Sequence, residues 1–306
     1  MGLVVTSLTA FVDETGAIIN KAVLGARTLK SGIRIEPGIK SSKNIHTLSS
    51  TLYAQANSTC GFESSGSSTL GQVTLSVCPL KVNEDICIET LEGYYTQMML
   101  KDGSYNESLG GFEAYFASEK AAALSALIEV LIWQGSTTNG TGNNSLCNGL
   151  LWEADRVVSA STVNVTVTAM TVANAISLVD VLVNNIPAAV RGENDLTLFM
   201  SETNFYLYAQ ALRNANYFHY DSTNPGTNWT IVHPASNVKV VGVAGLNGTA
   251  TRMILTPASN IVFGTDLERD YNDFRLWYSL DSQIEKFAAK WKQGVKFIYP
   301  DFVVRF

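Results

Sequence analysis

One long helical segment near the middle of the chain constrains the fold more than any other feature. Residues 108–134 read SLGGFEAYFASEKAAALSALIEVLIWQ, and Ser108 can cap the first turn. Apolar residues recur in it at helical spacing: Phe112, Phe116, Leu124, Leu127 and Leu131, with Ile128 and Ile132 on the flank. Gly135 and the polar stretch after it end the helix. Its length is roughly 35–40 Å, which few ordinary domains need.

Residues 45–82 predict a long β-ribbon. One arm is HTLSSTLYAQANSTCGF and the other is GQVTLSVCPLKV, in which Val73, Leu75 and Val77 alternate with polar residues. The segment ESSGSSTL between the arms is predicted to be a flexible tip. Because a two-stranded ribbon cannot bury its apolar side alone, it needs a partner surface in its own chain or in another.

The rest of the chain mixes helices and strands, so the predicted class is α+β. Residues 168–190 predict a helix, LTLFMS a strand, and ETNFYLYAQALRNA a second helix with Ser201 as its cap. Residues 229–263 return to strand character. This middle region is compact enough in pattern to form a domain of its own.

The carboxyl end predicts a strand with two distinct sides. Apolar residues fall on one side (Phe287, Ala289, Trp291, Val295, Phe297), and four lysines fall on the other (Lys286, Lys290, Lys292, Lys296). A row of lysines is costly unless it meets acids, phosphates or open water. A solvated face that protects the strand from aggregation explains the row at least as well as phosphate contact does.

Charged residues are few and unevenly distributed. The 21 basic and 27 acidic residues give a net charge of −6, which argues against a dedicated nucleic-acid binder. By the same count, the net charge is +3 over residues 1–43, −10 over 44–200 and +1 over 201–306. Such a distribution favours partners that differ along the chain, including further copies of it, although chance clustering explains it as well.

The sequence carries no pattern typical of an enzyme, a cofactor site or a metal site. His46, His219 and His233 lack metal-ligand spacing, and the acids of DLERDYNDF lack the pattern of a calcium loop. We therefore predict no catalytic residue, no cofactor and no metal.

The compartment is predicted from the cysteines and the amino terminus. The four cysteines, Cys60, Cys78, Cys87 and Cys147, lack the spacing and density of a disulfide scaffold, so we expect free thiols in a reducing compartment. We also expect no secretory signal at MGLVVTSLTAFVDETG and no membrane-spanning segment.

The order of arm, ribbon, long helix, α/β insertion and closing strand resembles the major capsid proteins of tailed double-stranded DNA phages, which have the Hong Kong 97-type fold. The closest likeness is to phages of Bacteroidota, including the crAss-like group. Five segments carry it: MGLVVTSLTAFVDE, ICIETLEGYYTQMML, SNVKVVGVAGLNGTATRMILTP, NIVFGTDLERDYNDFRLWYS and KFAAKWKQGVKFIYPDFVV.

The resemblance implies a domain plan. Residues 1–40 correspond to the N-arm and residues 41–85 to the extended E-loop. Residues 86–149 and 260–306 correspond to the peripheral domain, with the spine helix at about 108–134. Residues 150–259 correspond to the axial domain, which meets its copies at hexamer and pentamer axes.

The same resemblance implies partners and contact residues. The subunit is expected to assemble with itself, with a separate scaffold protein, with portal and decoration proteins, and non-specifically with packaged double-stranded DNA. It is expected in the virion after assembly in the bacterial cytoplasm, without processing or covalent crosslinks. We expect neighbour contacts from the N-arm (Arg27, Lys30, Arg34) and from the E-loop tip (Phe62, Glu63, Leu70), and an inner-face or inter-subunit role for the four-lysine row.

Two alternatives remain open at the level of sequence. An encapsulin-type shell shares the expected architecture but encloses a cargo enzyme. A secreted adhesin or carbohydrate-binding module would fit the Ser/Thr/Asn-rich composition, the ribbon and the several Asn-x-Ser/Thr sequons. The long helix and the missing secretory signal argue against the second alternative.

Overall fold

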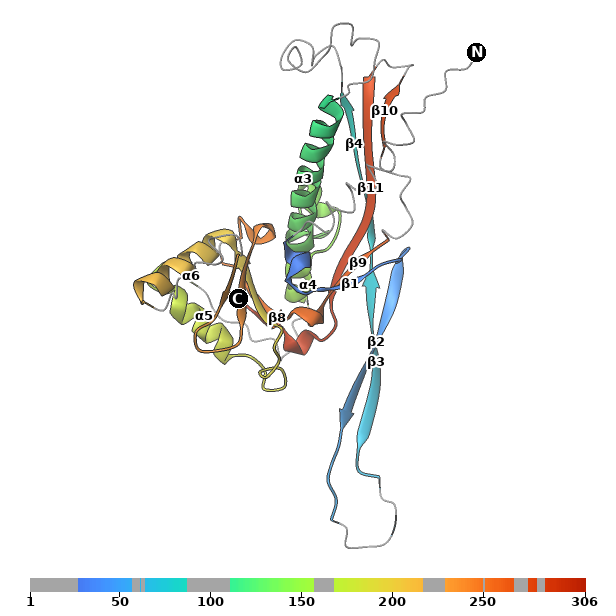
Figure 1. Cartoon of the computed structure of the whole chain (residues 1–306). Coiled ribbons are helices and arrows are strands. Elements are labelled where there is room, and N and C mark those ends of the chain that lie inside the picture. The colour runs from blue at the N-terminus through green and yellow to red at the C-terminus, as the bar shows by residue number, and fades with distance from the viewer. Residues whose placement is uncertain are drawn as a thin grey trace.

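The computed structural model describes residues 27–56, 61, 64–86, 111–156, 168–216, 229–249, 251–266, 275–279 and 284–306. Three parts are visible in Figure 1: a tall slab in which a long helix lies beside a sheet, a rounded lobe on one side, and a two-stranded ribbon that projects from the end of the slab. The α+β class expected from the sequence is confirmed.

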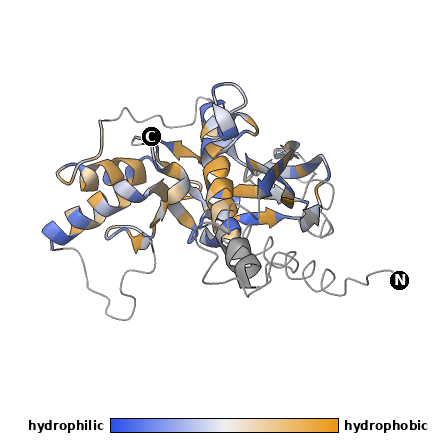
Figure 2. Ribbon diagram, turned by 90° about the horizontal axis from the view of Figure 1, so that it is seen from above, coloured by the Kyte–Doolittle hydropathy of each residue, from blue (hydrophilic) through white to orange (hydrophobic). Residues whose placement is uncertain are grey.

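Helix α3 (Gly111–Gln134) is the predicted long helix. Of the predicted apolar stripe, Leu124, Ile128, Leu131 and Ile132 are buried. Ser108 lies outside the described residues, as do the side chains of the first turns. Viewed from above, hydrophobic residues gather where α3 passes between the lobe and the slab's sheet (Figure 2). One core cluster accordingly takes residues from α3 and from both sheets.

The slab's sheet is organised around one long strand, β11 (Ile284–Phe297). Its neighbours are β10 (Arg275–Ser279), β4 (Cys78–Ile86) and β9 (Ile261–Thr265), and β1 (Arg34–Glu36) pairs in parallel with β9. The predicted alternation of the carboxyl strand is confirmed: the five apolar side chains are buried, while the four lysines are half-buried or exposed.

The lobe contains a second sheet whose strands β5 and β8 are buried on both faces. Its strand order is β12 (Val304–Arg305), β8 (Ile254–Pro257), β5 (Leu196–Ser201), β7 (Lys239–Val243) and β6 (Thr230–Val232). Leu198 and Met200 face the helices α5 (Ala175–Asn184) and α6 (Glu202–Asn214), whereas Phe199 faces α3. Burial on both faces explains the three consecutive apolar residues Leu198, Phe199 and Met200 of β5.

Two sequence predictions for the lobe met different outcomes. The cap of α6 is confirmed, because the backbone N–H of Asn204 donates to Ser201 Oγ at 3.2 Å. The helix predicted over 168–190 is too long, since α5 spans only residues 175–184. The side chain of Asn174 accepts from the N–H of Thr171 at 2.6 Å, which stabilises a turn before the helix.

The ribbon consists of β2 (Ser42–Thr51) and β3 (Ser67–Ser76), paired in antiparallel register. Strand β3 begins inside the segment predicted to be the flexible tip, so the ribbon is longer than predicted on that side. Strand β4 follows β3 after a single residue, leaves the ribbon and joins β11 in the slab. One extended stretch therefore runs from the ribbon into the slab.

Short helices complete the described structure. They are η1 (Thr28–Ser31), η4 (Gly142–Ser145), α4 (Leu150–Arg156), η5 (Ala244–Leu246), η6 (Ala258–Asn260) and η7 (Pro300–Phe302). No helix in the described part of the chain is long and apolar enough to cross a membrane.

The expectation of four free thiols is wrong for two of them. Cys78 and Cys147 form a disulfide with their Cα atoms 5.9 Å apart. The two residues are 69 positions apart in the sequence, so no local spacing signalled the pair. Cys60 and Cys87 lie outside the described residues.

Candidate assembly surfaces

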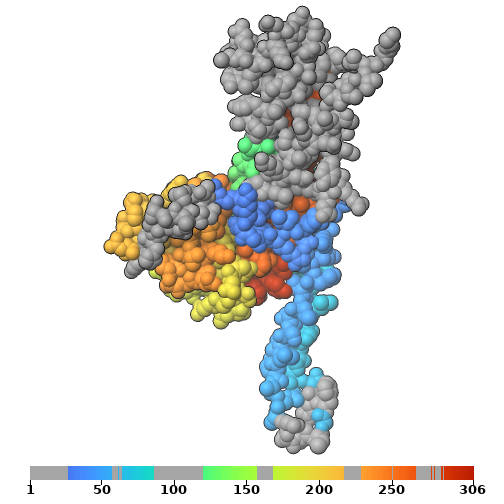
Figure 3. All heavy atoms as spheres, viewed as in Figure 1, coloured from blue at the N-terminus to red at the C-terminus, as the bar shows by residue number. Residues whose placement is uncertain are grey.

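The ribbon presents apolar side chains that are exposed in the described part of the chain. Leu48 and Leu70 lie directly opposite each other across β2 and β3, and they are 64% and 72% exposed. Figure 3 shows the ribbon as a narrow column standing clear of the body. Of the expected tip contacts, Leu70 thus lies on an exposed strand, while Phe62 and Glu63 lie outside the described residues. The two leucines therefore form a small apolar surface that is exposed on a projecting ribbon.

The base of the ribbon packs on the slab through a cluster of its own. The cluster consists of Ile39, Ile45, Leu75, Val77, Val262 and Ile298. Nearby, the chain crosses β11 at Gly294, where an added Cβ would lie only 2.1 Å from the carbonyl oxygen of Ser76. Only glycine permits so close an approach between the two backbones.

The four lysines of β11 do not share one environment. Lys292 Nζ binds Asp266 Oδ2 at 2.8 Å and the carbonyl of Lys40 at 3.0 Å. Lys296 Nζ binds Glu153 Oε2 of α4 at 2.7 Å. These two lysines are neutralised within the chain, so they are not available as a uniform basic row.

Lys286 and Lys290 lie on the sheet face that points away from α3. Lys286 is opposite Asp85 of β4, and Lys290 is opposite Lys81. The other face of the same strand pair meets α3, since Glu84, opposite Phe287, forms an ion pair with a lysine of that helix. On this face the exposed side chains of Lys290 and Lys81 lie opposite each other on β11 and β4, and Lys286 is half-buried.

The expected N-arm contact Arg27 is used within its own subunit. Its guanidinium donates to Glu202 Oε1 at 2.7 Å and to the carbonyl of Gly242 at 3.0 Å. It also lies over the ring of Trp229, 4.6 Å from the centroid. Arg27 therefore fastens the segment before η1 to the lobe.

The other two N-arm candidates are exposed. Arg34 pairs with Glu36, which also binds Lys43 at 2.5 Å. The hydrogen bond from Lys43, aided by Arg34, holds the pKa of Glu36 below its ordinary value despite some desolvation. Lys30 lies exposed on η1. Of the three, Lys30 is the basic side chain best placed to contact a neighbour.

A buried glutamate joins the first described residues to the long helix. Both carboxylate oxygens of Glu129 accept from the backbone N–H of Thr28, at 3.2 and 3.1 Å, and the Thr28 hydroxyl donates to one of them. Trp133 Nε1 donates to the same hydroxyl at 2.7 Å. Burial raises the pKa of Glu129, although these hydrogen bonds and Arg27 oppose the shift. Sequence periodicity offered no sign of this junction.

Asp266 is a second buried carboxylate, with opposite behaviour. Burial alone would raise its pKa, but the hydrogen bonds and charges of Lys292 and Lys40 outweigh burial and lower it. Lys40 lies 3.0 Å from Asp266 Oδ1, close to the start of the ribbon. The aspartate therefore bridges the entry of the ribbon to β11.

A buried histidine in the lobe lies between an aspartate and a serine. His233 Nε2 lies 2.9 Å from Asp180 Oδ1, and Nδ1 lies 2.9 Å from Ser236 Oγ. The Ser236 hydroxyl accepts from the N–H of Val238, and His233 is only 4% exposed. These contacts fix a turn against α5.

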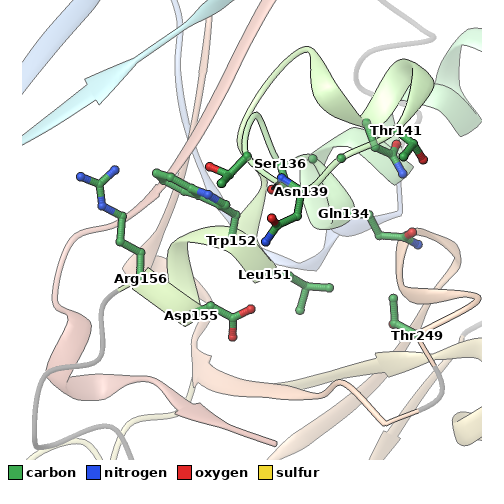
Figure 4. A pocket seen from close by; sticks show the side chains of 13 residues that line it. Gln134, Ser136, Asn139, Thr141, Leu151, Trp152, Asp155, Arg156 and Thr249 are labelled. Atoms are coloured by element: carbon green, nitrogen blue, oxygen red, sulfur yellow. Dashed lines mark hydrogen bonds between the residues drawn. The ribbon is translucent and has the colours of Figure 1, made fainter.

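An open cavity of about 700 Å³ lies between the end of α3, the loop around η4 and α4 (Figure 4). The guanidinium of Arg156 lies over the ring of Trp152, 4.9 Å from the ring centroid. Asp155 is bound by Arg305 at 2.7 Å and by Arg252. Apart from Asp155 and Arg156, most of the residues that line the cavity carry neutral hydroxyl or amide groups. In the described part of the chain no cluster of three or more His, Cys, Asp or Glu residues could hold a metal.

Comparison with known proteins gave no match by sequence and extensive matches by structure. No family model and no curated protein matches the chain. A chain of the satellite phage P4 procapsid, solved with its size determination (Sid) protein, has a TM-score of 0.58 at 13% identity, and the match covers 100% of this chain and 90% of that one.

Two further structures extend the comparison. The capsid of Myoviridae phage XM1 has a TM-score of 0.56 at 13% identity, with 90% of each chain covered. The virus-like particle from Pyrococcus furiosus has a TM-score of 0.51 at 10% identity, covering 96% of this chain and 98% of that one. At such identities the likeness concerns the fold. The ribbon, the slab with its long helix and the lobe together form the Hong Kong 97-type fold of phage capsid shells.

Proposed function

We propose that this chain is the major capsid protein of a tailed bacteriophage, and that its copies form hexamers and pentamers of an icosahedral head around double-stranded DNA. The observation that carries the proposal is the exposed Leu48–Leu70 pair on a ribbon that projects from a shell-type fold. A lone subunit would leave this apolar surface in water, whereas a neighbouring copy would cover it.

Several partners belong to the same proposal. The shell would meet a separate scaffold protein during assembly in the bacterial cytoplasm, then portal and decoration proteins, and finally packaged DNA in the virion. The affinity with phages of Bacteroidota rests on the segment resemblance alone. The full-length fold match favours a shell over a secreted adhesin.

The test changes the exposed pair. In Leu48→Ser with Leu70→Ser, the subunit should fold normally but form far fewer particles, because the pair contributes nothing to its own core. Ser49 and Thr69 lie opposite each other in the next register position and face the other side. Ser49→Thr with Thr69→Ser is therefore the matched control.

Particles are counted by electron microscopy, and folding is followed by circular dichroism. Loss of particles in the leucine variant alone supports the proposal. Equal particle yields from both variants, or no particles from the unaltered chain under any assembly condition, would contradict it.

An encapsulin-type shell is the second candidate, because the Pyrococcus furiosus particle shares the fold over 96% of this chain. The content of purified particles separates the two. Particles from the native source that protect double-stranded DNA from nuclease support the phage head, and particles that retain a protein cargo without DNA support the alternative.

Within the four-lysine row, two lysines are the candidates for contact with another molecule. We propose that Lys286 and Lys290 contact DNA or an acidic neighbour, because Lys290 is exposed and lies opposite a third lysine, the exposed Lys81 of β4. Lys286→Ser with Lys290→Ser should reduce DNA retention. Lys292→Ser with Lys296→Ser should lower subunit stability instead. Unchanged retention in the first variant would mean that its face is only solvated.

A further inference from the structure

Cys78 and Cys147 join the ribbon to the body of the subunit. Cys78 is the first residue of β4, two positions after the end of β3, and lies opposite Gln293 of β11. Cys147 lies between η4 and α4 and is 2% exposed; its Sγ is 3.5 Å from the carbonyl oxygen of Gln293. The disulfide thus ties the returning arm of the ribbon to the loop that follows α3.

The Cys147 end of this connection is a fixed point. The N–H of Gly149 donates to the carbonyl of Gly135 at 2.7 Å, and that of Ser136 donates to the carbonyl of Asn144 at 2.7 Å. A Cβ on Gly135 would lie 2.3 Å from the carbonyl oxygen of Cys147, so the loop closes tightly on the end of α3. Cys147 is therefore held in place relative to the long helix.

The Cys78 end lies where the ribbon meets the slab, because Cys78 is the first residue of the ladder that β4 forms with β11. The ribbon base has its own small apolar cluster of six buried residues, separate from the main core. A hydrogen bond from the N–H of Val77 to the carbonyl of Ser41, at 2.9 Å, closes the ribbon where its two strands meet the slab. A covalent bond one residue beyond Val77 adds a constraint at the junction between the ribbon and the slab.

Disulfides are rare in proteins that assemble in a reducing cytoplasm and persist outside cells. We propose that Cys78 and Cys147 form an oxidative modification site that is a dithiol while shells assemble and becomes a disulfide after release, which then fixes the ribbon to the body. The timing rests on the proposed function, whereas the mechanical effect does not.

The chemistry is thiol–disulfide exchange with a small-molecule disulfide such as oxidised glutathione. Cys78 is half-buried and Cys147 is buried, so the oxidant reaches Cys78 first. Its thiolate attacks the small disulfide, forms a mixed disulfide and expels one small thiol. The Cys147 thiolate then attacks the Cys78 sulfur and expels the second thiol. Two protons and two electrons leave the cysteines, and the small disulfide is reduced to two thiols.

The timing is tested by trapping thiols at lysis. Particles are produced in a reducing bacterial cytoplasm from a Cys60→Ser, Cys87→Ser chain, lysed into excess alkylating agent and examined by peptide mass spectrometry. We expect both remaining cysteines to be alkylated at lysis, and a peptide linking residues 78 and 147 to appear after incubation with oxidised glutathione. A linked peptide already present at lysis, or crosslinks between subunits, would overturn the proposed order.

The mechanical effect is tested by amide hydrogen exchange at Val77. Oxidation should slow exchange there by roughly tenfold, which corresponds to about 1.4 kcal/mol. Cys147→Ser, which cannot form the bond but keeps a side chain of similar size, should exchange like the reduced chain under both conditions. Equal exchange in the oxidised and reduced chains would refute the fixing of the ribbon.

The two proposals fail in different ways. A chain that oxidises and gains protection but never forms shells contradicts the capsid function and leaves the mechanical inference standing. Shells that form normally and remain dithiol in oxidised glutathione contradict the inference and leave the function standing.

Discussion

The crossing at Gly294 gives the sharpest quantitative prediction. In Gly294→Ala, the new Cβ would lie 2.1 Å from the Ser76 carbonyl oxygen, and ordinary contact begins at 3.4 Å, so the ribbon base must retreat by about 1.3 Å. The obstacle is backbone in a paired strand, so no side-chain rotation relieves it. Overpacking of this kind costs about 1–3 kcal/mol, and we expect the upper end of that range.

The assay is urea unfolding of isolated, reduced subunits followed by circular dichroism. With a slope of about 3 kcal/mol/M, the midpoint should fall by about 1 M. Gly192→Ala is the matched control, because nothing lies within 4 Å of its added Cβ, and it should stay within about 0.5 kcal/mol of the unaltered chain. If both variants unfold at the same midpoint, the close crossing does not constrain the ribbon and the reasoning is wrong.

Three further substitutions test the buried and bridging contacts. Burial raises the pKa of Glu129, so the contribution of this residue to folding stability is fully present below its ordinary pKa of 4.5 and is lost as pH rises through the folded-state pKa. In Glu129→Gln, the urea midpoint measured across this pH range should change less with pH. The pKa of Asp266 is lowered, so its contribution to folding stability is present above its ordinary pKa of 3.8 and is lost as pH falls through the folded-state pKa. Asp266→Asn should therefore be less stable than the unaltered chain at pH 7, and the difference in stability should disappear in acid. Arg27→Ala should cost about 1–2 kcal/mol by thermal unfolding, because it removes a half-exposed ion pair, a hydrogen bond and the stack on Trp229, whereas Arg27→Lys should recover part of the loss.

Elements with strong local periodicity could be predicted from the sequence. Leu124, Leu131 and their flanking isoleucines repeat at the 3.6-residue period of a helix, and apolar and polar side chains alternate along β11. The sequence alone therefore predicts the long helix, the carboxyl strand and the buried side of each. The length of α5 was overestimated, because a small-residue pattern does not reveal that the turn at Asn174 delays the helix.

Contacts that depend on tertiary structure left no local signal. Cys78 and Cys147 come together only when β4 pairs with β11 and the loop after α3 closes. In the sequence, Arg27 is one of several evenly spread basic residues. Its hydrogen-bond partners, Glu202 and Gly242, lie 175 and 215 positions away. The alternation of lysines with apolar residues predicts that the lysines share one side of the carboxyl strand. Only the tertiary structure shows that Lys296 binds Glu153 of α4.

The distribution of the cores indicates where a subunit of this shape can adapt to different shell positions. The main core cluster joins α3 to both sheets; within it, Trp133 lies 5.1 Å from the ring of Phe199 in the lobe, and a Cβ on Gly245 would lie 2.3 Å from the Trp133 ring. Hinging between lobe and slab would break these contacts, so the body resists bending. The base of the ribbon rests on a separate cluster of six residues and is held by the close crossing at Gly294. In the shell that we propose, differences between subunit positions would therefore be accommodated by the ribbon beyond its base, and the disulfide reinforces that base.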